Sequence, residues 1–118
     1  MRKILRRHHI SFKNAFAGLF WALRTQPNFQ IHFLSAIAAV WLGMYLGITR
    51  TEMLIIIFTI LLGLTGEMIN TAVESVTDLV TREWRTDAKI AKDVSAGMML
   101  TIAIGALVIA GYIFIPYL

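Results

Sequence analysis

Three long apolar segments constrain this chain more than any other feature of its sequence. They run over residues 31–48, 53–76 and 94–117. Each comes close to or exceeds the ~20 residues that an α-helix needs to cross the ~30 Å hydrocarbon core of a bilayer. With 118 residues, 58% of them hydrophobic, and a mean hydropathy of +0.70, the chain lacks the polar residues that would cover a soluble core. The sequence therefore predicts an all-α membrane protein with three transmembrane helices.

The segment before the first span, from about residue 10 to residue 26, is predicted to form an amphipathic helix on the membrane surface. Its apolar residues recur at helical spacing, and Lys13 and Arg24 lie off that stripe. A basic run within residues 2–7 precedes it, a combination typical of interfacial helices. A mere charged tail is the alternative for residues 1–9, and Pro27 is expected to end the helix. The stripe comprises Phe12, Phe16, Leu19, Phe20 and Leu23.

Lysine and arginine are distributed unevenly between the connections. Six lie in the N-terminal region, Arg50 stands alone between the first two spans, and four lie between the second and third spans. The positive-inside rule then places the N-terminus and residues 78–93 in the cytoplasm and the C-terminus outside, in a multi-pass protein of the cytoplasmic membrane. The net charge of +4 comes from basic residues in the segments that flank the spans. The sequence therefore does not indicate nucleic acid as a partner.

The second span ends in an acidic stretch, GEMINTAVESVTD, over residues 66–78. At 100° per residue, Glu67, Glu74 and Asp78 lie within about 40° of one another on a helix, and Asn70 flanks that line. At 1.5 Å per residue from Met53, Glu67 lies roughly 21 Å along the helix and Glu74 roughly 31 Å. A carboxylate inside the bilayer requires a partner or a cavity.

Oxygen ligands of this kind favour a hard cation. The chain has no cysteine, and the acidic stretch contains no histidine. On the cytoplasmic side, Mg²⁺ bridging the phosphates of ATP is the natural candidate. As alternatives, Asn70 and Thr71 would hold helices together through hydrogen bonds, and Asp78 would be a solvated residue at a helix end.

The third span begins with DAKIAKDVSAG over residues 87–97. Lys89 and Lys92 share a helix face there, where they would hold phosphate oxygens, and Asp93 would contact a metal or a hydroxyl. Lysines that extend from the membrane boundary into water are the simpler alternative. The chain has no GxxxxGK[ST] loop, so phosphates would be held by metal and side chains.

These residues resemble the prokaryotic diacylglycerol kinase family, whose Gram-positive relatives act as undecaprenol kinases. The resemblance rests on Glu67-x-x-Asn70-Thr71-Ala72-x-Glu74-x-x-x-Asp78, followed by Ala91-Lys92-Asp93, and on Ser11, Phe12, Ala15 and Gly18. It extends over nearly the whole chain. It implies a small homotrimeric membrane lipid kinase that uses ATP and Mg²⁺, with no further protein partner indicated.

The resemblance also implies roles for individual residues. Glu74 would be the general base and a metal ligand. Glu67 and Ser95 would contact the lipid substrate. Gln26 stands where the family commonly carries a metal-binding glutamate, so this position offers an amide oxygen without a charge. The residues implied in nucleotide binding are Glu67, Asn70, Glu83, Trp84, Arg85, Lys92 and Asp93.

The acceptor lipid is left open between two alcohols. The segment NFQIH, residues 28–32, resembles the undecaprenol branch of the family, and diacylglycerol is the alternative. A non-enzymatic membrane oligomer, such as a cation-conducting bundle, is the alternative of a different class. A pore is disfavoured because residues 53–64 are apolar apart from Thr59, so that the polar groups gather at one end of the span.

Overall fold

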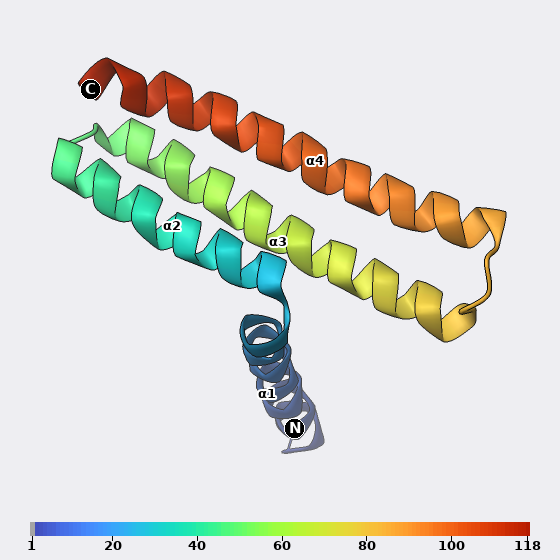
Figure 1. Ribbon diagram of the computed structural model, residues 1–118. Coiled ribbons are helices and arrows are strands. Elements are labelled where there is room, and N and C mark those ends of the chain that lie inside the picture. The colour runs from blue at the N-terminus through green and yellow to red at the C-terminus, as the bar shows by residue number, and fades with distance from the viewer. Residues whose placement is uncertain (1) are drawn as a thin grey trace.

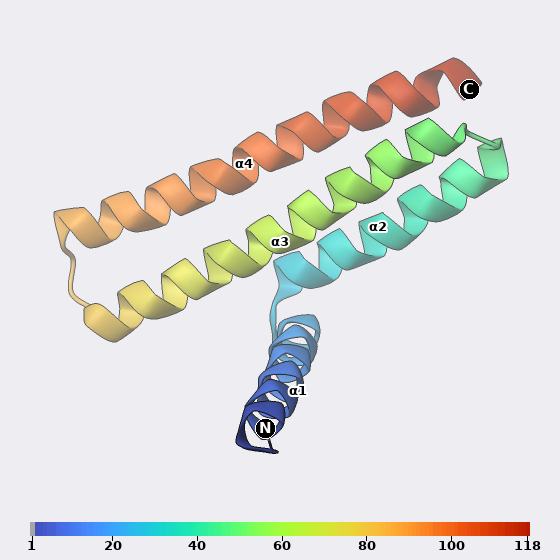
Figure 2. The same ribbon diagram turned by 180° about the vertical axis from the view of Figure 1, so that it is seen from behind.

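The computed structural model describes the backbone of residues 2–118 and the side-chain surroundings of residues 11–118. Its helices are α1 (Arg2–Thr25), α2 (Pro27–Leu46), α3 (Arg50–Val80) and α4 (Thr86–Phe114), and a short 3₁₀ helix, η1 (Ile115–Tyr117), follows. Helices α2, α3 and α4 lie side by side with α3 in the middle, and α1 leaves this layer at a steep angle (Figure 1). The same arrangement is seen from behind (Figure 2).

Three helices are long and apolar enough to cross a membrane: α2, α3, and α4 together with η1. This confirms the predicted all-α fold with three candidate spans. The helices extend beyond the apolar segments: α3 begins before residue 53 and ends after residue 76, and α4 begins before residue 94. Arg, Lys and Glu have helix propensities close to that of Leu, and other polar residues lower the stability of a helix only slightly, so hydropathy marks the membrane segment and not the helix end.

The ends of the helices follow from a few residues. Gln26 has an extended backbone (φ −104°, ψ 105°), and Pro27 occupies the first turn of α2, where a missing N–H is tolerated. Gly47 ends α2 in the left-handed conformation, with φ 67°, which glycine adopts without strain. For this reason α2 ends at Leu46. Residues 47 and 48, which the sequence placed in the first span, therefore lie outside α2.

Helix α1 is longer than the predicted surface helix. It begins at Arg2 and so includes residues 2–9, for which a charged tail was the alternative. Phe12, Phe16 and Phe20 of its apolar stripe are each more than half exposed in the protomer. Their contact with a membrane surface stays a prediction.

The buried core of the described residues lies at the end of the layer near the C-terminus. Ile56 of α3 meets Ile113 and Phe114 of α4, and half-buried residues of α2 pack around them. Most other large apolar side chains of α2, α3 and α4 are exposed, as expected for helices whose solvent is lipid.

Helices α3 and α4 approach closely near the middle of the layer because Gly66 presents no side chain there. A Cβ atom at this position would lie 2.5 Å from Ile102 Cδ1 and 3.3 Å from Met99 Sδ. Small residues allow such close helix contacts in membranes. This packing fixes the position of Glu67, the next residue, between α2 and α4.

Candidate active site

Two side-chain pairs join the polar stripe of α3 to the beginning of α4. Ser95 Oγ donates a hydrogen bond to Asn70 Oδ1 at 2.6 Å, and Lys92 Nζ pairs with Asp78 Oδ1 at 2.7 Å. Ser95 is buried, whereas both members of the ion pair are partly exposed. The stripe and the opening of α4 therefore form one site, although 14 and 25 residues separate the partners in sequence.

Glu67 is the buried carboxylate of this site. Only 4% of the residue is exposed. It lines a cavity of about 300 Å³ together with Asn28 and His32 of α2 and Met99, Leu100 and Ala103 of α4. None of the hydrogen bonds and ion pairs formed among residues 11–118 involves its carboxylate. Because no fully enclosed side-chain oxygen or nitrogen among residues 11–118 lacks a hydrogen-bond partner, the carboxylate oxygens of Glu67 open into the cavity, where water or a ligand can meet them.

Glu74 lies two turns further along α3, in a different environment. Its side chain is exposed, and it too takes no part in the hydrogen bonds and ion pairs of residues 11–118. An exposed carboxylate is accessible to a cation or a nucleotide that arrives from solution. The two glutamates of the stripe therefore have separate surroundings, one inside the layer and one at its surface.

The donor set fits a magnesium ion that arrives with its own ligands. No group of three or more histidine, aspartate or glutamate side chains gathers to hold a metal ion among residues 11–118. Mg²⁺ commonly takes only one or two carboxylates from a protein and the rest of its ligands from phosphates and water. The exposed carboxylate of Glu74 is a ligand of this kind.

The connection between α3 and α4 is held by short local contacts. Glu83 N donates to Thr81 Oγ1 at 3.1 Å, and Arg85 Nη2 pairs with Glu83 Oε2 at 3.3 Å. Trp84 is 76% exposed. Beside this connection a cavity of about 560 Å³ opens between the last turns of α3 and the first turns of α4, and Thr81, Arg85 and Asp87 contribute to its lining.

Two predicted site residues lie apart from these pairs. Asp93 is exposed and pairs with Lys89 on its own helix. Gln26 is half-buried at the junction of α1 and α2, where its Nε2 donates to Thr25 Oγ1 at 3.2 Å. The structure brings Asn28 and His32 to Glu67, and neither was predicted as a site residue. Their spacing of four residues at the start of a helix was the available signal, since it places them on one face.

Comparison with known proteins gives consistent matches over most of the chain. A family model described as prokaryotic diacylglycerol kinase matches residues 13–114. A diacylglycerol kinase of Synechocystis sp. is 37% identical over 108 residues, which cover 91% of this chain and 62% of that relative. An undecaprenol kinase of Bacillus subtilis is 35% identical over 117 residues, which cover 99% of this chain and 95% of the relative. The chain therefore spans less than two thirds of the Synechocystis protein and nearly all of the Bacillus protein.

Proposed function

Because the chain belongs to the prokaryotic diacylglycerol kinase family, we propose that it transfers the γ-phosphoryl group of ATP to the hydroxyl of a membrane lipid. One observation carries the proposal beyond family membership. A single helix face bears one carboxylate buried in a cavity between the membrane helices and a second carboxylate exposed at the end of the layer. A lipid alcohol and a water-soluble nucleotide require these two environments side by side.

In the proposed reaction Glu74 acts as general base and as a ligand of Mg²⁺. The carboxylate accepts the proton of the lipid hydroxyl, and the hydroxyl oxygen forms a bond to the γ-phosphorus of ATP. The bond from that phosphorus to the β,γ-bridging oxygen breaks, and ADP leaves. Most of the rate enhancement in phosphoryl transfer comes from positioning and charge neutralisation, which bound Mg²⁺ and lysine supply.

The nucleotide-binding residues of the proposal lie at the α3–α4 end of the layer. Lys92 supplies the positive charge for phosphate oxygens, and its partner Asp78 fixes its position. Asp93 and Asn70 complete the phosphate side, and Glu83, Trp84 and Arg85 contact the nucleoside from the connection. On the lipid side, Glu67 and Ser95 lie deeper in the layer, where they contact the lipid whose hydroxyl group reaches Glu74.

We propose undecaprenol as the acceptor, with diacylglycerol as the alternative. A relative of which the match covers 95% is named an undecaprenol kinase. The N-terminus and residues 78–93 face the cytoplasm, where ATP is present, and α1 lies on the membrane surface. The enzyme works as a homotrimer in this proposal: the exposed apolar faces and the exposed Glu74 support self-association, and the number three comes from the resemblance to the family alone.

Label transfer from radioactive ATP tests this function. The purified protein in mixed micelles receives undecaprenol or diacylglycerol in separate reactions, with Mg²⁺ or with a chelator. We expect Mg²⁺-dependent labelling of undecaprenol above diacylglycerol. The reverse preference would support the alternative acceptor, and no label in either lipid would overturn the lipid kinase assignment.

The same assay tests whether Gln26 acts as a metal ligand. Gln26→Glu adds the charge that the family commonly has at this position, so we expect tighter Mg²⁺ binding, seen as a lower Mg²⁺ concentration for half-maximal rate. An unchanged Mg²⁺ dependence would exclude Gln26 from the metal site.

A further inference from the structure

Ser95 is a buried hydroxyl residue of α4, with only 6% of its surface exposed. Its Oγ donates a hydrogen bond to Asn70 Oδ1 of α3 at 2.6 Å. Among residues 11–118, this bond and the pair of Lys92 with Asp78 are the only polar side-chain contacts that join α3 to α4. A buried hydroxyl that reaches across to the acidic stripe is therefore part of the way α4 meets the candidate site.

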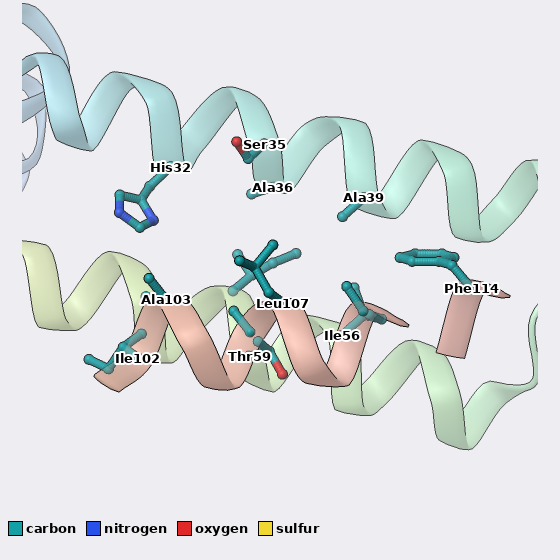
Figure 3. A pocket seen from close by; sticks show the side chains of 14 residues that line it. His32, Ser35, Ala36, Ala39, Ile56, Thr59, Ile102, Ala103, Leu107 and Phe114 are labelled. Atoms are coloured by element: carbon teal, nitrogen blue, oxygen red, sulfur yellow. The ribbon is translucent and has the colours of Figure 1, made fainter. Parts of the chain in front are cut away.

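Deeper in the layer the contact between α3 and α4 loses its polar character. The side chains of α4 that face the layer there are apolar, as Ile102, Ala103 and Leu107 show in Figure 3. Thr59 of α3, drawn in the same view, donates to the carbonyl oxygen of Ile55 in its own helix at 2.8 Å. Among the described residues, the bond from Ser95 therefore marks the inner limit of the polar contact between α3 and α4.

We propose that Ser95 is a positioning residue, which fixes the amide group of Asn70 so that its Nδ2 atom faces the phosphoryl group to be transferred. The proposal rests on the proposed lipid kinase function and deepens it, because it states how Asn70 is prepared for phosphate. Only the hydrogen atom of the Ser95 hydroxyl is used in this way. The lone pairs of Oγ stay available for contact with the lipid.

The orientation of an amide decides which charge it favours, because it carries an acceptor at one end and two N–H donors at the other. An amide without a fixed partner can turn and present either end. The Ser95 hydroxyl holds Oδ1 of Asn70 towards α4 and so turns Nδ2 away from Ser95. Nδ2 has no hydrogen-bond partner among residues 11–118, where no fully enclosed side-chain nitrogen lacks one. It is therefore open and free to donate to an anion.

The γ-phosphate is the part of the nucleotide that can reach this donor. Asn70 and Glu74 lie one turn apart on the same face of α3, and Asn70 is roughly 6 Å deeper along the helix. One turn beyond Glu74 on the other side, Asp78 pairs with Lys92. A nucleotide that enters at the exposed end of the layer passes Lys92 first and meets Asn70 only with its terminal phosphate. The effect of Ser95 is therefore expected at the γ-phosphate alone.

Binding of two nucleotides tests this orientation without catalysis. The full chain in mixed micelles with Mg²⁺ receives either AMP-PCP, whose γ-phosphate cannot be transferred to the lipid, or ADP, which has no γ-phosphate. We expect Ser95→Ala to weaken the binding of AMP-PCP about fivefold, the equivalent of one net hydrogen bond, and to leave the binding of ADP unchanged. Equal losses for the two nucleotides would indicate a general structural defect and would overturn the proposal, as would no loss for AMP-PCP.

Two further variants control this comparison. Thr101→Val removes a hydroxyl of α4 that donates to Gly97 O in its own helix at 2.9 Å, and the parent's affinity for both nucleotides is expected. Ser95→Cys keeps the shape of the side chain but offers only a weak donor, so it should show the same selective loss. This variant decides if Ser95→Ala does not fold. A loss of AMP-PCP binding in Thr101→Val equal to that in Ser95→Ala would contradict the proposal.

The rate of lipid phosphorylation tests whether Ser95 acts through Asn70. At saturating undecaprenol, a weakened lipid contact does not limit the rate. We expect Ser95→Ala to lower kcat about fivefold in the parent and to have no further effect in the Asn70→Ala variant, where the amide is absent. The same factor in both backgrounds would show that Ser95 acts independently of Asn70, and the proposal would fail. If Asn70→Ala is too slow to assay, the nucleotide comparison decides.

The outcomes separate this proposal from the proposed function. A parent that labels no lipid, together with a selective loss of AMP-PCP binding in Ser95→Ala, would refute the kinase and retain the positioning of Asn70. A parent that labels a lipid, together with a Ser95→Ala variant that equals it in both assays, would retain the kinase and refute the positioning role. A parent that binds no AMP-PCP would overturn both.

Discussion

At the scale of single residues, Gly66 controls how closely α3 and α4 approach beside the candidate site. Ile102 Cδ1 occupies the space that a side chain at this position would need. We expect Gly66→Leu to destabilise the folded protein by about 1–3 kcal/mol, the usual cost of overpacking. The measurement is unfolding of the purified protein by SDS in mixed micelles, followed by circular dichroism.

Gly97→Leu is the matched control for this substitution. A Cβ atom on Gly97 meets no atom within 4 Å in the protomer, and both glycines lie inside long helices. We expect Gly97→Leu to unfold near the parent's SDS concentration. Equal loss of stability in the two variants would show that the Gly66 contact does not determine the packing of α3 against α4.

At the scale of an element, the start of α3 is held by a capping box that also fastens the C-terminus. Thr49 Oγ1 accepts from Glu52 N at 3.2 Å, and Thr49 N donates to Glu52 Oε2 at 2.8 Å. Tyr117 Oη donates to the same carboxylate oxygen at 2.6 Å. One residue of the first turn therefore joins α3 to the end of the chain.

Loss of the cap is expected to weaken the fold and leave the chemistry intact. Thr49→Ala removes the side-chain acceptor and should cost about 1 kcal/mol of stability, the typical value for an N-cap. The neighbouring exposed residue Thr51, changed to alanine, is the control. Unfolding by SDS measures the stability of both variants. If Thr49→Ala is as stable as Thr51→Ala, the cap does not stabilise the fold.

At the scale of the whole molecule, hydropathy was sufficient to predict three helices, because a bilayer requires about 20 apolar residues for each span. The line of Glu67, Asn70, Glu74 and Asp78 also followed from helical periodicity. Helical periodicity did not predict which of these side chains are buried and which are exposed. Glu67 is buried because both α2 and α4 lie beside its part of α3, whereas α2 does not reach the last turns of α3, which carry the exposed Glu74 and have only α4 beside them (Figure 1).

Contacts between distant residues were also beyond the reach of one sequence. Lys92 and Lys89 share a helix face, yet the structure pairs the first with Asp78 of α3 and the second with Asp93 of α4. The proximity of His32 to Glu67 depends on how α2 crosses α3. Helical spacing within one segment gives no information on such crossings, which packing determines.

The central claim is that Glu74 enables transfer of phosphate from ATP to a lipid alcohol. The most direct measurement is the initial rate of undecaprenol phosphorylation by Glu74→Gln, beside the parent and Glu52→Gln, which changes a carboxylate at the far end of the same helix. We predict that Glu74→Gln lowers the rate by about 10²–10⁴-fold, the usual contribution of a general base. Glu52→Gln should retain the parent's rate. A folded Glu74→Gln variant that phosphorylates undecaprenol as fast as the parent would contradict the account.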